Sequence, residues 1–125
     1  MQGVLIDTDI AIDFLRGVVS AHHFISGLWA NNQAVLSVLT VYELTAGMKE
    51  SEKVVTHNFI EACAVEPLST EISCRGGDLY RKYRAKGITL TSLDCLIAAT
   101  AIEKGYKVAT RNVEHYPEQG LLIKL

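Results

Sequence analysis

Residues 4–9 read VLIDTD, and this stretch decides the fold class of the chain. Its first three residues form a continuous apolar run, which is typical of a strand buried on both faces of a parallel sheet. Asp7 and Asp9 end this run, and apolar residues at helical spacing begin at Ile10. A carboxylate at the end of a buried strand is destabilising unless it is paired or binds a cation. The stretch therefore predicts a central strand and a functional position at Asp7.

The same change from a short apolar run to a helical pattern recurs along the 125 residues. We predict further strands at 35–38, 106–110 and 121–125, whereas residues 65–68 fit either a short strand or an extended connection. The predicted helices cover residues 10–15, 20–30 (capped by Ser20), 40–48, 50–62, 70–86 and 91–104. This alternation predicts an α/β fold with a mostly parallel sheet, in a single domain over residues 1–125.

The composition limits the class of protein. Apolar residues make up 49% of the chain and charged residues 21%, which is typical of a globular protein and excludes disorder. The apolar runs are too short to span a bilayer, and Asp7 and Asp9 interrupt the N-terminal apolar region, so we expect a cytoplasmic protein with no membrane partner. The net charge of -2 argues against a large DNA-binding surface. The cysteines, which lack metal-site spacing, are predicted to be buried reduced thiols: Cys63, Cys74 and Cys95.

Three acids and one amide are predicted to meet at one edge of the sheet. Ligands of an open parallel sheet bind beyond the carboxyl ends of the strands. Asp7 follows the first strand, Glu43 and Asp94 fall in the first turns of two helices, and Asn112 follows a later strand. Clustered carboxylates need a counter-ion, and ligands that are all oxygen favour Mg²⁺ or Mn²⁺ over zinc. The pattern predicts metal-assisted hydrolysis of a phosphodiester.

Each acid also has a purely structural interpretation. The spacing from Thr40 to Glu43, and from Thr91 to Asp94, fits a capping box in which the acid only closes a helix N-terminus. Asp9 is interpreted first as a helix cap and second as a peripheral ligand. Asp13 is most simply part of a solvated face.

Two arginines are candidates for contact with a substrate. Arg16 and Arg111 each lie close in sequence to an acid or amide of the predicted edge. The predicted helix over 70–86 is more basic, but its simplest interpretation is a solvated face whose long side chains cover the core. The alternative is a surface that binds a phosphate backbone. Its basic residues are Arg75, Arg81, Lys82, Arg84 and Lys86.

These motifs resemble, in the same order, those of the PIN-domain family. They are VLIDTD at 4–9, VYEL at 41–44, SLDCLIAATA at 92–101 and ATRNV at 109–113. The similarity covers essentially the whole chain and is greatest to VapC-type toxins of bacterial toxin–antitoxin pairs. It implies a three-layer α/β domain, with about four to five strands flanked by helices.

The resemblance also implies a function. It indicates a Mg²⁺- or Mn²⁺-dependent endoribonuclease that forms a homodimer and is inhibited by a small antitoxin protein. By motif position, Asp7 and Asp94 are direct metal ligands, and Glu43 is a ligand directly or through water. Thr110 and Asn112 line the fourth corner of the site, Thr110 as a substrate contact and Asn112 as a metal ligand.

The last motif departs from the family pattern. Family members often have a fourth acid at the position of Asn112 or of His115, and the nearest acid here is Glu114. An asparagine binds a cation through its carbonyl but adds no charge, which favours one tightly held ion over two. The alternative function is therefore a catalytically weak or inactive PIN-like module that binds RNA or protein. A phosphohydrolase is disfavoured, because no lysine follows a strand end at a suitable place.

Overall fold

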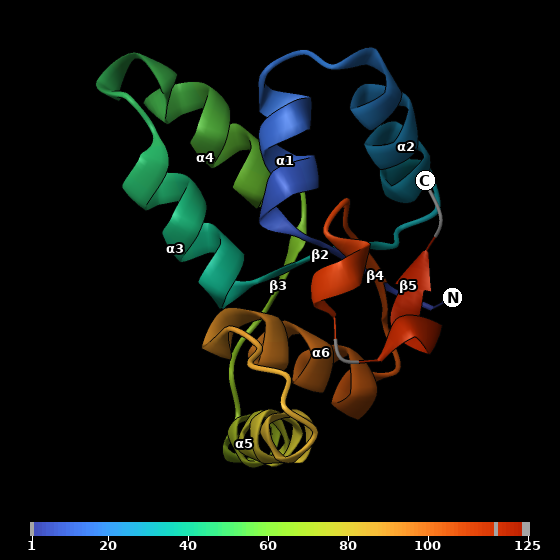
Figure 1. Cartoon of the computed structure of the whole chain (residues 1–125). Helices are drawn as coiled ribbons and strands as arrows, with labels where there is room; N and C mark the ends of the chain where they lie inside the picture. The colour runs from blue at the N-terminus through green and yellow to red at the C-terminus, as the bar shows by residue number, and fades with distance from the viewer. Residues whose placement is uncertain (1, 117, 124–125) are drawn as a thin grey trace.

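The computed structural model describes residues 2–116 and 118–123, and a five-stranded sheet runs through the middle of these residues (Figure 1). The strands lie in the order β3-β2-β1-β4-β5, and each neighbouring pair is parallel. The predicted α/β fold with a mostly parallel sheet is confirmed. The strands are β1 (Val4–Ile6), β2 (Ala34–Ser37), β3 (Ala64–Glu66), β4 (Lys107–Ala109) and β5 (Leu122–Ile123).

Helices cover both faces of this sheet and form the two outer layers of a three-layer fold (Figure 1). On one face α1, α2 and α4 pack against Val4 and Ile6, and on the other face α5 and α6 pack against Leu5. The three side chains are at most 3% exposed, because successive residues of a strand point to opposite faces and both faces are covered. The helices are α1 (Thr8–Leu15), α2 (Val19–Ala30), α3 (Val38–Gly47), α4 (Lys53–Glu61), α5 (Thr70–Ala85) and α6 (Ser92–Lys104).

Three helix starts differ from the prediction. Asp7, not Asp9, is the N-cap of α1, and its side chain accepts a hydrogen bond from the Thr8 N–H at 2.9 Å. Ser20 lies inside α2, whose N-cap is Val18. Helix α3 begins directly after β2, because Ser37 ends the strand and its hydroxyl accepts from the helix N–H two residues on.

The other element boundaries differ from the prediction by a few residues. A 3₁₀ turn at Glu50–Glu52 precedes α4, where one continuous helix was predicted. Residues 64–66 form a true strand, which settles the open alternative for this segment. The last predicted strand is reduced to β5 after a 3₁₀ turn at Gln119–Leu121, and its residues 124–125 lie outside the described residues.

The cysteines and the hydropathy give two further results. Cys63 and Cys95 are buried free thiols as predicted, but Cys74 is exposed, so the prediction is wrong for this residue. Within residues 2–116 and 118–123, no helix is long and apolar enough to cross a membrane.

Candidate active site

The site is built around Asp7, the residue that follows β1. Its backbone N–H donates to the Ala109 carbonyl at 2.9 Å, so the pairing of β1 with β4 continues into the site. The carboxylate is 7% exposed and accepts three hydrogen bonds. One goes from the Thr8 N–H to Oδ1, and two go from hydroxyls to Oδ2, Thr110 at 2.8 Å and Tyr116 at 2.9 Å. These donors offset the loss of hydration that burial of the charge entails.

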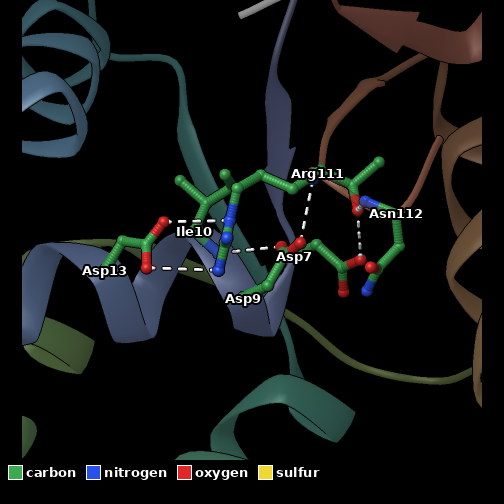
Figure 2. A network of polar contacts seen from close by, with 7 residues as sticks. Asp7, Asp9, Ile10, Asp13, Arg111 and Asn112 are labelled. Atoms are coloured by element: carbon green, nitrogen blue, oxygen red, sulfur yellow. Dashed lines mark hydrogen bonds and ion pairs between the residues drawn. The ribbon is translucent and has the colours of Figure 1, made fainter.

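Thr110 connects this carboxylate to the loop after β4. The residue is 2% exposed, and its hydroxyl also accepts from the Asn112 N–H at 3.0 Å. Asn112 is thereby held next to Asp7 by its backbone, while its side chain is exposed (Figure 2). Thr110 was predicted as a substrate contact, yet its hydroxyl is used inside the protein.

Asp9 holds the same loop from the other side. Its Oδ2 accepts from the Arg111 N–H and its Oδ1 from the Ile10 N–H, both at 2.8 Å. Burial raises the pKa of Asp9, the hydrogen bond from Arg111 partly opposes this, and the charge of Asp7 raises it further. Asp9 is therefore a link between α1 and the loop after β4.

The guanidinium of Arg111 lies over Asp13 on the second turn of α1 (Figure 2). Its Nε is 3.0 Å from Oδ2, and its Nη2 donates to Oδ1 at 3.2 Å, which makes a two-pronged ion pair. The Asp13 side chain is 18% exposed, so the prediction of a solvated face is wrong. The Arg111 side chain, at 61%, remains largely open to solvent.

Glu43, on α3, is linked to the site by a hydrogen bond with Thr8. The Thr8 hydroxyl donates to Glu43 Oε1 at 2.5 Å, and Thr8 is the residue between the two aspartates. Because α3 begins at Val38, Glu43 lies in the second turn and not in the first as predicted. The capping-box alternative for Glu43 is wrong, since Ser37 and not Thr40 is the N-cap.

Asp94 enters from the N-terminus of α6. Its backbone N–H donates to the hydroxyl of the N-cap Thr91 at 3.1 Å, so this cap is present as predicted. Its charge also reaches the centre of the site. Burial raises the pKa of the Tyr116 phenol far above its usual range, and the charges of Asp7, Asp94 and Asp9 raise it further. Asp94 thus shares one electrostatic environment with Asp7, and Tyr116 remains a hydroxyl that donates.

Arg16 lies apart from this network, at the C-cap of α1. It lines a groove of about 230 Å³ between α1, α3 and α4, and Glu43 lines the same groove. The remaining walls are largely apolar, including Leu15, Leu44 and Val55. The structure therefore brings Arg16 near Glu43, but not into the hydrogen-bonded network of Asp7.

The acids share an edge of the sheet without forming a finished coordination shell. Within the described part of the chain, no three His, Cys, Asp or Glu side chains are grouped closely enough to hold one metal ion. Asp7, Asp9 and Glu43 accept hydrogen bonds from protein donors instead. The chemistry of the candidate ligands still fits Mg²⁺ or Mn²⁺, because all are oxygens. Oδ1 of Asp7 has one hydrogen-bond donor among the described residues and keeps one lone pair.

Sequence reasoning missed two members of this site, Thr8 and Tyr116. Thr8 lies inside the first motif, and its hydroxyl is the bridge to Glu43. Tyr116 lies 109 residues from Asp7, in a segment without helical or strand periodicity. An aromatic residue with a polar group shortly after the last motif was the only available signal.

Comparison with known proteins places the chain in one family. The family model of the PIN domain matches residues 4–116, and the chain belongs to the PIN-domain family. Ribonuclease VapC19 of Mycobacterium tuberculosis is 39% identical over 114 residues, which cover 90% of this chain and 91% of that protein. Ribonuclease VapC10 of the same organism is 34% identical, over 91% of this chain and 86% of that protein.

A solved structure agrees in fold. The DNA-bound VapBC structure from Salmonella typhimurium superposes with a TM-score of 0.83 at 21% identity, over 98% of this chain and 96% of that chain. The resemblance stated from the motifs is thus confirmed, as is the three-layer fold.

Proposed function

We propose that this protein is a metal-dependent endoribonuclease, the toxin of a toxin–antitoxin pair, which hydrolyses RNA phosphodiesters at the edge formed by Asp7, Glu43 and Asp94. The observation that carries the proposal is the buried Asp7, held by three donors and sharing its electrostatic environment with Asp94. Relatives of 39% and 34% identity over nearly the full chain are named ribonucleases, which supports the same activity.

Asp7 and Asp94 are the proposed direct ligands, and Glu43 is a ligand directly or through water. Asn112 offers its side-chain carbonyl as a further, uncharged ligand. Bound Mg²⁺ or Mn²⁺ supplies activation of a water molecule and stabilisation of negative charge on the phosphate. Glu43, which the Thr8 hydroxyl holds at Oε1, would orient the attacking water. Thr110 holds the Asp7 carboxylate in place.

Arg111 is the proposed contact for the RNA backbone. Its side chain is 61% exposed, and it is held beside the acids by the ion pair with Asp13 and by the hydrogen bond from its backbone N–H to Asp9. A phosphate group, like the Asp13 carboxylate, presents anionic oxygens as acceptors. The N–H donors of the Arg111 guanidinium can therefore bind either the carboxylate or a phosphate. Arg16 is placed to touch a more distant part of the RNA, at the groove that Glu43 also lines.

The partners follow from the same proposal. The cognate partner is a small antitoxin protein, and the toxin forms a homodimer. Similar solved structures are toxin–antitoxin assemblies, such as a complex from Klebsiella pneumoniae, which supports an antitoxin as partner. Cys63, Cys74 and Cys95 are free thiols, which supports a reducing compartment such as the cytoplasm. Residues 1–125 are proposed to act as one domain.

The test is cleavage of a mixed RNA pool by purified protein that has been freed of any antitoxin. Wild type and Asp94→Asn are compared with Mn²⁺ or Mg²⁺ and again with EDTA, and we expect cleavage only by wild type with metal. Asp78→Asn is the matched control, because Asp78 lies on α5 in an exposed ion pair with Arg81. Activity in Asp94→Asn equal to that of wild type contradicts the assigned site.

The second candidate is a PIN-like module that binds RNA or protein without cleaving it. Asn112 favours it, because this position contributes no charge to the site. In that case folded wild type and Asp94→Asn both leave the RNA intact, and both bind it equally well in a gel-shift assay.

A further inference from the structure

We propose that Tyr116 is a positioning residue for the metal site, because its hydroxyl and that of Thr110 occupy Oδ2 of Asp7 and leave Oδ1 as the oxygen that binds the cation. This inference rests on the proposed metal-dependent activity. It adds a residue that belongs to none of the motifs and fixes which atom of Asp7 is used.

The count of lone pairs carries the argument. Each carboxylate oxygen has two lone pairs in its plane. Oδ2 of Asp7 accepts from Thr110 at 2.8 Å and from Tyr116 at 2.9 Å, so both of its lone pairs are used. Among the described residues, Oδ1 accepts only the Thr8 N–H, at 2.9 Å, and so keeps one lone pair. Asp7 can therefore bind one cation through one oxygen, and bidentate binding requires loss of a hydroxyl contact.

Burial makes this arrangement rigid. Tyr116 is 4% exposed, and its ring packs in the apolar cluster between the sheet and helices α5 and α6. Thr110 is 2% exposed and is held by the Asn112 N–H. Neither hydroxyl is replaced by water without opening the core. These two donors fix the orientation of the Asp7 carboxylate, as hydrogen bonds to metal ligands do in many metal sites.

The experiment compares Tyr116→Phe with Tyr106→Phe. Phenylalanine keeps the ring in the core and removes only the phenol oxygen. Tyr106 is a matched control, because its phenol donates to the carboxylate of Glu66 at 2.6 Å, away from Asp7. Both variants thus lose a phenol–carboxylate hydrogen bond, but only one loses it at the proposed metal site. Thermal unfolding without metal establishes that each variant is folded.

Binding of Mn²⁺ to the metal-free protein is measured by electron paramagnetic resonance, and RNA cleavage is measured as a function of Mn²⁺ concentration. We expect Tyr116→Phe to bind Mn²⁺ about tenfold more weakly, the lower end of typical second-shell effects. Cleavage by this variant returns to the wild-type rate at saturating Mn²⁺. Tyr106→Phe binds Mn²⁺ as wild type does.

Other outcomes overturn the inference in distinguishable ways. Unchanged Mn²⁺ affinity in Tyr116→Phe, with an active wild type, refutes the positioning role and leaves the proposed function standing. Equal weakening of Mn²⁺ binding in both variants indicates a general loss of stability and also refutes the positioning role. A loss of cleavage that Mn²⁺ does not restore shows that Tyr116 does not act through metal binding. Absence of Mn²⁺ binding by wild type refutes the inference together with the proposed metal site.

Discussion

Replacement of Thr110 by valine tests how the buried carboxylate is held. Valine has nearly the shape of threonine but neither donates nor accepts. The change removes the hydrogen bond to the charged Asp7 and the bond from the Asn112 N–H. A hydrogen bond to a charged group contributes about 1.5–3 kcal/mol, and a neutral one contributes about 0.5–1.5 kcal/mol. Thr110→Val is thus expected to lower the free energy of unfolding by about 2–4.5 kcal/mol.

Thr110→Ser is the matched control for this change. Serine keeps both hydrogen bonds and loses one buried methyl group, for a loss of about 1 kcal/mol. Urea unfolding followed by circular dichroism, in EDTA so that no cation contributes, measures both variants. If Thr110→Val is as stable as Thr110→Ser, the hydroxyl does not stabilise the Asp7 carboxylate, and the assigned network is wrong.

Two further predictions concern helix α5 and the tyrosine outside the site. Gly77→Ala is expected to raise the free energy of unfolding by about 1 kcal/mol through helix propensity, because a Cβ at Gly77 meets nothing within 4 Å. Gly76→Ala gains less, because its Cβ comes within 2.9 Å of a Leu96 methyl; equal gains in urea unfolding contradict this. The hydrogen bond to Glu66 raises the pKa of Tyr106 from 10.0 to about 12, so its contribution is complete below pH 10 and is lost as pH rises toward 12. The stability of wild type relative to Tyr106→Phe is therefore constant from pH 8 to about pH 10 and lower at pH 11 in the same assay, and an unchanged difference at pH 11 refutes the assignment.

The parts of the fold that sequence reasoning predicted well are those where several local signals agree. Helix α6 runs from Ser92 to Lys104, with Thr91 as its N-cap, close to the predicted 91–104. A capping residue, an apolar pattern and a terminal glycine point to the same boundaries there, and Gly105 adopts the left-handed conformation with φ of 72°. Strand β1 was equally clear, since a continuous apolar run suits only a strand covered on both faces.

The predicted helix starts were wrong where two neighbouring residues can both act as the N-cap. Ser37 and Thr40 are both good N-caps, and the sequence does not show that strand β2 joins helix α3 without a turn. The same ambiguity applied to Asp7 and Asp9 at α1. Each error moved a helix start by two residues, and for Glu43 this changed the turn of the helix that carries it.

The roles of Asp13 and Tyr116 were not predicted for a different reason, namely the distance along the chain to their partners. Asp13 has the helical position and charge of an ordinary surface residue, and only its contact with Arg111, 98 residues away, gives it a role. Tyr116 is the same case, with a partner 109 residues away. Pairing of this kind depends on which strands are neighbours, because the pairing of β1 with β4 brings the loop after β4 next to α1. One sequence contains no direct signal of that pairing.

Residues 7–9 also show how the protein itself stabilises the acids at this edge of the sheet. Asp7 caps α1, Thr8 binds Glu43, and Asp9 binds the Arg111 N–H, so three consecutive residues each tie one element to the end of β1. All three lie at the N-terminus of a helix, where the aligned peptide dipoles favour negative charge. Donors and dipole together offset the repulsion between the carboxylates. The stretch that predicts a functional position at Asp7 therefore also stabilises the fold around that position.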